Sequence, residues 1–271
     1  MRDLTLAIYQ MDVITGKKDK NLAKITQLLA NYTESIDLLV VPELFTTGFC
    51  YDKFDVLAEE KNNSETINSL EKLSQEYSIG IAGSILMVHK HNKKMASKKA
   101  LNIGFIIEPA KGAIYSYQKV NLWNQEKKHF IPGNILPEPV NFMNKATIGL
   151  LICYDLRFPE MYRKLALNGA DIILTTAAWP SARVQHFNLL AAARALENTC
   201  YHLVVNRIGR EETTATTTLY PGSSRIINPC GKSIIEATTK DEVISATLTE
   251  KKLQNTRQKL PVLEDWKKVI E

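Results

Sequence analysis

Residues 146–160 read ATIGLLICYDLRFPE, and the rest of the expected fold is arranged around this stretch. Its apolar run, 148–152, is short, branched and bounded by polar residues, as in a buried strand. Pro159 and Glu160 are typical of the first turn of a helix. Cys153 is therefore predicted at a strand-to-helix junction, where free backbone N–H groups and the helix dipole favour the thiolate. A buried apolar cysteine is the alternative, and this stretch alone leaves both readings open.

The composition is that of a soluble globular protein: 271 residues, 45% hydrophobic and 23% charged. A chain of this length can bury a sizeable core. The formal net charge of +5 is mild and spread out, so no nucleic-acid partner is predicted. Residues 89–99, HKHNKKMASKK, concentrate lysines, and a solvated hairpin loop is favoured there over a phosphate-binding patch.

The N-terminal segment, the apolar runs and the cysteine spacing predict where the protein is located and whether its thiols are reduced. The N-terminus, MRDLTLAIYQMD, is too short and too polar for a signal peptide, and no apolar run approaches the roughly 20 residues that span a bilayer. We therefore expect a cytoplasmic protein with reduced thiols and no membrane contact. No C-x-x-C pair is present, so neither a metal site nor a disulfide framework is predicted. The cysteines are Cys50, Cys153, Cys200 and Cys230.

Strand-like and helix-like segments alternate in the first and third quarters of the chain, with hairpins between them. This order predicts an α/β protein whose sheets are covered by helices. No short-period repeat and no clear linker is present, so residues 1–271 are predicted as one domain. The expected helices are 18–31, 64–77 with Ser64 as N-cap, and 182–198. The expected strands are 4–10, 37–43, 79–88, 101–107, 113–118, 148–152, 170–177, 201–206, 223–228, 233–237 and 243–248.

Two segments are less regular. Residues 120–139 carry aromatic residues and prolines, and a structureless stretch this long is usually functional or disordered. The aromatic residues argue against disorder. The charged tail, 251–271, is broken by Pro261 and carries Trp266, and we expect it to pack either on a partner subunit or on its own core.

Three reactive side chains each follow a strand: Glu43, Lys119 and Cys153. The carboxyl ends of sheet strands converge on one crevice in α/β folds, so these side chains are expected to meet. A cysteine can attack a carbonyl carbon, and a carboxylate can serve as base for the thiol and later for water. An ammonium, helped by the backbone N–H of Tyr154, can stabilise the oxyanion. Taken singly, each residue also has an ordinary structural role open to it.

A Cys–His pair is the rival constellation. His129, His186 and His202 are the candidates, but no motif places any of them beside Cys153. Oxidation sensing by a low-pKa thiol is a further reading, although no resolving cysteine is near in sequence.

The segments VVPELFTTGF (40–49), SYQKVNL (116–122) and LLICYDLRFPE (150–160) resemble the nitrilase superfamily, the carbon–nitrogen hydrolases. The match in order and spacing extends along nearly the whole chain. The resemblance implies a four-layer αββα sandwich that dimerises into a longer sandwich, with no metal or organic cofactor. It also implies a catalytic triad of Glu43, Lys119 and Cys153. A second glutamate, Glu126 in WNQEKKHFIPG, matches a family position that would hold Lys119 and the substrate amide.

Further segments resemble the bacterial omega-amidases, namely 47–49, 178–180 with Arg183 and His186, 193–198, and 206–209. That branch releases ammonia from the terminal amide of small ω-amido 2-oxo acids such as 2-oxoglutaramate. Arg183 is a candidate for binding the substrate carboxylate, or it pairs with a carboxylate on its own helix. Trp179 and Tyr154 are expected at the pocket, and Phe45 either walls the pocket or belongs to the core. Ion pairs of the scaffold are expected for Arg157, Glu160, Arg194 and Glu197.

The resemblance leaves the substrate open. Another amidase or carbamoyl hydrolase of the superfamily, such as a deaminated-glutathione amidase or an N-carbamoyl hydrolase, is the first alternative. A binding protein that kept the fold and lost activity is the second, and the intact Glu, Lys, Glu and Cys set argues against it. Water and a small amide are the expected reaction partners, with a homodimer as the expected assembly.

Overall fold

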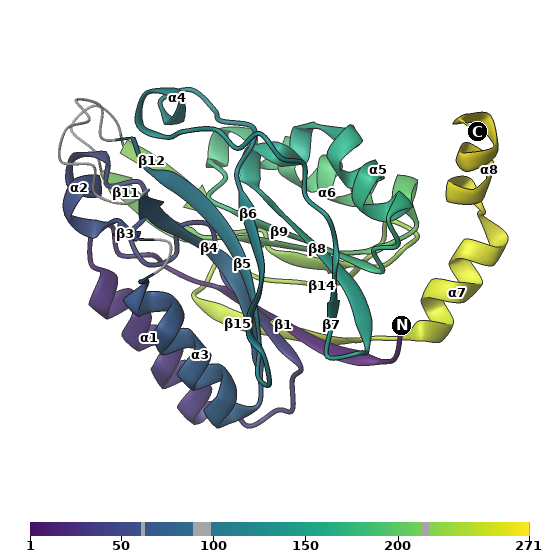
Figure 1. Cartoon of the computed structure of the whole chain (residues 1–271), viewed down its shortest axis with the longest axis horizontal. Helices are drawn as coiled ribbons and strands as arrows, with labels where there is room; N and C mark the ends of the chain where they lie inside the picture. Colours follow the sequence, from purple (N-terminus) through teal and green to yellow (C-terminus); the bar gives the residue numbers. More distant parts are fainter. Residues whose placement is uncertain (61–62, 89–98, 213–216, 271) are drawn as a thin grey trace.

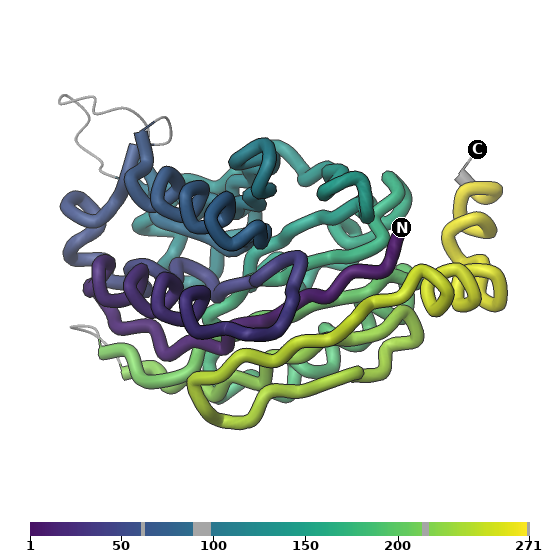
Figure 2. Tube along the Cα trace, turned by 90° about the horizontal axis from the view of Figure 1, so that it is seen from below, coloured from purple at the N-terminus to yellow at the C-terminus, as the bar shows by residue number. Residues whose placement is uncertain are grey.

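The computed structural model describes residues 1–60, 63–88, 99–212 and 217–270. Within them, two β-sheets lie face to face with helices on both outer faces, so the α/β class and the four-layer αββα order are confirmed (Figure 1; Figure 2). The lysine-rich segment expected as a hairpin loop lies outside the described residues, except for Lys99. One domain over 1–271 stays a prediction. In the described part, no helix has the length and apolar character needed to cross a membrane.

The first sheet has the order β15-β1-β2-β4-β5-β6, with β3 beside β4. β2 and β4 are parallel, and β4, β5 and β6 follow one another antiparallel. β6 therefore runs in the direction of β2, and both strands end at the same edge. The strands are β1 (Leu4–Gln10), β2 (Leu38–Val40), β3 (Glu59–Glu60), β4 (Gly80–Val88), β5 (Leu101–Glu108), β6 (Gly112–Gln118) and β15 (Glu242–Leu248).

The second sheet has the order β14-β13-β10-β9-β8-β7. Its centre, β8, β9 and β10, is parallel, so the residues after these strands emerge at one edge. A separate hairpin, β11 with β12, follows β10. The strands are β7 (Val140–Phe142), β8 (Ala146–Ile152), β9 (Ile172–Ala177), β10 (Tyr201–Asn206), β11 (Ile208–Glu212), β12 (Thr217–Pro221), β13 (Arg225–Ile227) and β14 (Ser233–Glu236).

Four long helices form the outer layers. α1 (Lys18–Asn31) and α3 (Glu65–Tyr77) cover the first sheet, and α5 (Pro159–Leu167) and α6 (Val184–Asn198) cover the second (Figure 1). Ser64 caps α3 by accepting a hydrogen bond from the Ile67 N–H, as predicted. The other helical elements are η1 (Tyr51–Lys53), α2 (Phe54–Leu57), α4 (Glu126–His129), η2 (Cys153–Arg157), η3 (Ser181–Arg183), α7 (Glu250–Lys259) and α8 (Val262–Ile270).

Alternation along the strands produces two kinds of core. Leu6 and Ile8 of β1 belong to the apolar cluster that includes the second sheet, whereas Ala7 and Tyr9 belong to the cluster beneath α1 and α3. The sheets approach closely at Gly104 of β5, where an added Cβ would lie 2.5 Å from the Leu150 side chain of β8. The short distance between the sheets is what allows residues from both to form one site.

Several boundaries differ from the expected ones. β2 ends at Val40, before the predicted 43, because Pro42 has no backbone N–H with which to continue the ladder, and the chain then turns at Leu44, which has a φ of 46°. The hairpin at 208–221 was not expected, since its residues lack a clear apolar alternation.

The tail divides at Pro261 into α7 and α8. Leu253 of α7 is fully buried and Leu263 of α8 packs on the same core, so the tail contacts its own chain. Trp266 is 45% exposed, and Figure 2 shows α8 extending away from the main body.

Candidate active site

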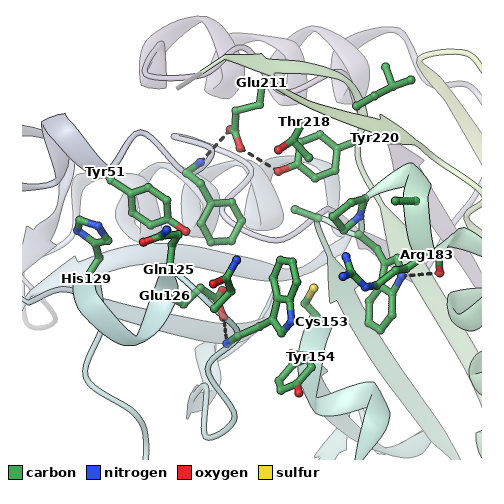
Figure 3. Close-up of a pocket in the computed structure, with 18 of the residues that line it drawn as sticks. Tyr51, Gln125, Glu126, His129, Cys153, Tyr154, Arg183, Glu211, Thr218 and Tyr220 are labelled. Carbon is green, nitrogen blue, oxygen red and sulfur yellow. Dashed lines mark hydrogen bonds between the residues drawn. The ribbon is translucent and has the colours of Figure 1, made fainter. Parts of the chain in front are cut away.

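Cys153 stands where β8 ends and η2 begins. The predicted junction is confirmed, although the first turn is a 3₁₀ helix and α5 starts only with Pro159. Cys153 has a φ of 46°, a left-handed conformation that a non-glycine residue adopts only at a cost in free energy. Its side chain lines a cavity (Figure 3). The turn thus holds the sulfur at a cavity wall.

Lys119 follows β6 and lies between two carboxylates. Its Nζ is 2.8 Å from Glu43 Oε1 and 2.6 Å from Glu126 Oε1. All three side chains are at most 5% exposed. Of the three, Glu126 and Lys119 line the cavity beside Cys153, whereas Glu43 lies deeper. The structure therefore brings together the four residues that the sequence singled out.

The Glu43 carboxylate is held from both sheets. Asn102 of β5 donates its side-chain N–H to Oε1 at 2.8 Å, and the backbone N–H of Ala178, just after β9, donates to Oε2 at 3.0 Å. Hydrogen bonds to both carboxylate oxygens fix the orientation of the group. Glu43 is thus a fixed base candidate at the joint edge of the two sheets.

Glu126 is the first residue of α4, and its carboxylate has a second contact besides Lys119. Its Oε2 accepts the backbone N–H of Trp123 at 2.6 Å. Burial raises the pKa of Glu126, and the Lys119 charge offsets this in part. Residues 120–139, expected to be irregular and functional, therefore contain one short helix that carries a carboxylate into the site.

The electrostatics set the resting state. Burial acts against the Lys119 ammonium, but the charges of Glu126 and Glu43 outweigh it and raise the pKa of Lys119 well above its ordinary value of 10.5. Burial, followed by the Glu43 charge, raises the pKa of the Cys153 thiol well above 9.0, and Lys119 offsets only part of this rise. Of the two readings that the sequence left open, this direction of the pKa shift favours the buried thiol over the thiolate in the resting site.

A cavity of about 820 Å³ opens in front of Cys153. Trp123 and Trp179 form aromatic walls, and the Arg183 guanidinium lies 5.0 Å above the Trp123 ring. The Trp179 indole N–H donates to the Arg183 carbonyl at 2.8 Å (Figure 3). Tyr154 also lines the cavity. These three expected substrate residues, Tyr154, Trp179 and Arg183, therefore lie at the pocket.

Phe45 does not line the cavity in front of Cys153. It is fully buried, packs 6.4 Å from Phe105 between ring centroids, and belongs to the core beneath α1 and α3. The placement in the pocket wall is corrected: the turn after Glu43 directs Phe45 away from the cavity.

Arg183 pairs with no carboxylate among the described residues, so the expected alternative of an ion pair on its own helix is not found there.

Arg157 differs from its expected role as a scaffold ion pair. It lines the cavity, lies 4.9 Å above the Trp179 ring, and contacts His186 Nδ1 at 3.3 Å. No carboxylate within the described ranges pairs with it, so the cavity holds a second available guanidinium. Arg194 does pair with Glu197, at 2.9 Å, as predicted. For Glu160 the described residues show no ion pair.

Glu211 and its neighbours were not anticipated. Glu211 of β11 lines the cavity at 2% exposure and accepts hydrogen bonds from the Phe49 N–H at 2.9 Å and the Tyr220 hydroxyl at 2.9 Å (Figure 3). Arg207 donates a further hydrogen bond to it at 2.8 Å. This carboxylate ties the hairpin to the turn after Glu43. Only the short pattern at 206–209 marked this region in the sequence.

The histidines do not pair with Cys153 in the described structure. His202 is buried, hydrogen-bonds with Thr175 at 2.8 Å and Ala191 at 3.0 Å, and burial lowers its pKa to about 4. His129 stacks on Tyr51 at 4.3 Å between ring centroids, at the cavity rim. Across the described residues, no cluster of three His, Cys, Asp or Glu side chains has a metal-binding arrangement.

The family model of the carbon–nitrogen hydrolases matches residues 5–258, so the chain belongs to the carbon–nitrogen hydrolase family. Enzymes of this family cleave carbon–nitrogen bonds with water, as the resemblance in the sequence implied.

Two relatives are similar over nearly the whole chain. The omega-amidase YafV of Escherichia coli K12 is 30% identical over 268 residues, 98% of this chain and 97% of the relative. The 2-oxoglutaramate amidase of Bacillus subtilis is 28% identical over 264 residues, 97% of this chain and 98% of the relative. A solved CN-hydrolase superfamily protein from Xanthomonas campestris, with an arsenic adduct in its active site, is 27% identical, with 98% and 97% coverage and a TM-score of 0.86.

Proposed function

We propose that this chain hydrolyses the terminal amide of a small carboxylate-bearing ω-amido acid, of which 2-oxoglutaramate is the type, to the acid and ammonia. The observation that carries the proposal is the buried Lys119, held by Glu43 and Glu126, beside a cysteine that faces a cavity. The names of the two relatives support an amide as substrate.

The first half of the reaction acylates the enzyme. Glu43 takes the Cys153 proton as the sulfur attacks the amide carbon, so the raised thiol pKa is overcome only when substrate is in place. The oxyanion forms between the Lys119 ammonium and the Tyr154 N–H. When the intermediate collapses, the carbon–nitrogen bond breaks, the nitrogen takes the proton from Glu43, and ammonia leaves a thioester on Cys153.

The second half returns the enzyme to its starting state. Glu43 accepts a proton from water, and the resulting hydroxide attacks the thioester carbon. The same ammonium and N–H stabilise the second oxyanion. Collapse breaks the carbon–sulfur bond, the thiolate recovers the proton from Glu43, and the acid is released. Glu126 keeps Lys119 in place and can accept an N–H of the substrate amide.

The acid end of the substrate needs a cation. Arg183 and Arg157 both line the cavity over the indole walls, and neither pairs with a carboxylate in the described part of the chain. A guanidinium can bind a carboxylate through two parallel hydrogen bonds. An anionic tail would therefore be held at the arginines, with the amide carbon at Cys153.

Ammonia release from a matched panel tests the proposal. The panel holds 2-oxoglutaramate, glutaramate and the neutral pentanamide, with deaminated glutathione and an N-carbamoyl amino acid for the alternative activities. We expect kcat/KM to be highest for 2-oxoglutaramate and lowest for pentanamide. Equal rates on charged and neutral amides would remove the acid specificity, and release only from deaminated glutathione or the carbamoyl compound would establish an alternative.

The homodimer and the cytoplasmic location remain predictions. Sedimentation velocity of the purified chain at two concentrations tests the first, since a dimer has twice the mass of the 30.6 kDa chain. Cell fractionation tests the second.

A further inference from the structure

Asp155 is a buried carboxylate that the reaction above does not use. It lies on η2, shortly after Cys153, is fully buried and does not line the cavity. Its Oδ2 accepts the Tyr117 hydroxyl at 2.9 Å and the Ile152 backbone N–H at 3.1 Å. Its Oδ1 accepts the side-chain and backbone N–H groups of Asn121 at 2.9 and 3.1 Å. Both oxygens are thus occupied by donors from separate segments.

These donors flank the reacting residues. Ile152 directly precedes Cys153 at the end of β8. Tyr117 and Asn121 stand on either side of Lys119, one at the end of β6 and the other in the loop after it. This single carboxylate therefore ties the segment that carries the ammonium to the segment that carries the sulfur.

The charge of Asp155 strengthens the link. Hydrogen bonds to an ionised acceptor are stronger and shorter than neutral ones. No cation of the described structure forms an ion pair with Asp155, and burial raises the pKa of Asp155 while the nearby Lys119 charge lowers it in part. A buried carboxylate without a contacting cation is costly, and hydrogen bonds to both oxygens are what make it tolerable.

We propose that Asp155 is a positioning residue that sets the place of the Lys119 ammonium relative to the Cys153 sulfur. The inference rests on the proposed function, in which Lys119 meets the oxyanion that forms when the sulfur attacks. A displacement of about 1 Å in such a group can cost roughly 100-fold in rate. Loss of Asp155 should therefore act on the chemical step and leave substrate binding in the cavity almost unchanged.

Asp155→Asn, Tyr117→Phe and a matched control test the proposal. Asn preserves the volume of Asp155 but replaces one carboxylate oxygen, which accepts hydrogen bonds, with an NH₂ group. That NH₂ group then faces an N–H or O–H donor that had bonded to the oxygen. Asp171→Asn is the control: Asp171 is also buried, accepts the Thr147 N–H at 3.1 Å, and lies before β9, at the strand end opposite to Ala178.

We expect Asp155→Asn to lower kcat by about 100-fold while KM changes by less than about threefold. Tyr117→Phe removes one donor and should lower kcat by about tenfold, again at constant KM. Asp171→Asn should lower Tm and leave kcat unchanged at temperatures where the protein is folded. If Asp155→Asn does not fold, Tyr117→Phe carries the test.

A substrate-free measurement separates this proposal from the proposed function. Glu43, Lys119 and Glu126 are the charged groups that act on the Cys153 sulfur. If Asp155→Asn lets Lys119 move away, the pH midpoint of Cys153 alkylation by iodoacetamide shifts upward, whereas loss of the Asp155 charge alone would shift it downward. Asp171→Asn would cause no upward shift. Wild-type kcat in Asp155→Asn, a kcat loss matched by Asp171→Asn, or an unshifted alkylation profile would each overturn the positioning role, whichever amide proves to be the substrate.

Discussion

The Lys119 ammonium lies 2.8 Å from the Glu43 carboxylate although 76 residues separate them in the chain. β2 and β6 run in the same direction within one sheet, so the residues after them reach the same edge. Glu126 closes the arrangement from the other side at 2.6 Å. The ammonium therefore balances the charge of two buried carboxylates, and the proposed reaction uses the same ammonium to stabilise the oxyanion.

Lys119→Met should test both roles. It leaves two buried carboxylates without their cation, which costs about 3–5 kcal/mol of unfolding free energy when a buried pair is broken. Loss of the oxyanion contact should lower kcat by about 100-fold or more. Urea unfolding and ammonia release are the measurements. Lys268→Met is the control, since Lys268 and its partner Asp265, at 3.2 Å, are both exposed, and about 0–1 kcal/mol is expected for such a pair.

Cys153→Ala should be folded and inactive. The substitution removes one sulfur from the cavity wall, so circular dichroism and Tm should stay close to those of the wild type. The wild type, quenched with acid during turnover, should show a mass increase equal to the acyl group, and the variant should not. Cys230→Ala, which removes an exposed thiol, is the control for both readouts. Turnover in Cys153→Ala would exclude this residue as the nucleophile.

The pH dependence of alkylation should report the thiol pKa. Because burial and the Glu43 charge raise the pKa of Cys153 well above 9.0, iodoacetamide should react slowly with Cys153 at neutral pH and faster as pH rises. Glu43→Gln removes a negative charge beside the sulfur, so the thiolate becomes easier to form and the midpoint should move to lower pH. Lys119 and Glu126 still act on the sulfur in that variant. Turnover should nevertheless be lost with the base.

The alkylation result has a clear contrary outcome. If Glu43→Gln leaves the midpoint unchanged or moves it upward, the Glu43 charge does not control the thiol. Cys153→Ala supplies the background from the other cysteines.

Arg183→Ala should change acid recognition. Losing a charge-assisted contact of about 1.5–3 kcal/mol raises KM for 2-oxoglutaramate by about 10- to 100-fold, and KM for pentanamide should stay the same. Steady-state ammonia release from both amides is the measurement. Arg210→Ala, an exposed arginine of β11 paired with Glu212, is the control. An equal rise in both KM values would mean that Arg183 shapes the cavity but does not bind the substrate carboxylate.

Ser64→Ala should affect stability alone. Ser64 Oγ accepts the Ile67 N–H at 3.0 Å at the start of α3, and loss of an N-cap costs about 1 kcal/mol. Urea unfolding should show this decrease, and Ser64→Thr should restore most of it. Because α3 lies on the outer face of the first sheet, kcat should be unchanged in both variants. A large loss of kcat in Ser64→Ala would contradict the separation of α3 from the site.

Local patterns predicted most of the elements, because apolar period and caps depend on near neighbours. The strand 4–10 and the helix 18–31 have the expected bounds. Errors arose where the chain turns under tertiary constraint. The turn after Val40 is stabilised by buried contacts. The pairing of β11 with β12 depends on Glu211, which accepts a hydrogen bond from Phe49 in a distant segment and another from Tyr220 across the hairpin.

The candidate site was predicted in part for the same reason. Glu43, Lys119, Glu126 and Cys153 follow recognisable motifs, and the structure brings them together. Arg157 was misassigned because its neighbour is an indole ring contributed by another strand end, which no local pattern reveals. The sequence left Phe45 open between the pocket wall and the core, because the direction of a side chain in a turn depends on the turn geometry.

By itself, the sequence determined the α/β class through local periodicity, and the resemblance of its short motifs to the nitrilase superfamily implied the layer order and the residues that meet at the strand ends. Only the tertiary structure decided the direction in which the pKa of the Cys153 thiol shifts and the charge pattern of the cavity. These properties depend on burial and on carboxylates that arrive from other parts of the chain, and an electrostatic free energy is set by distances in space and by the loss of water.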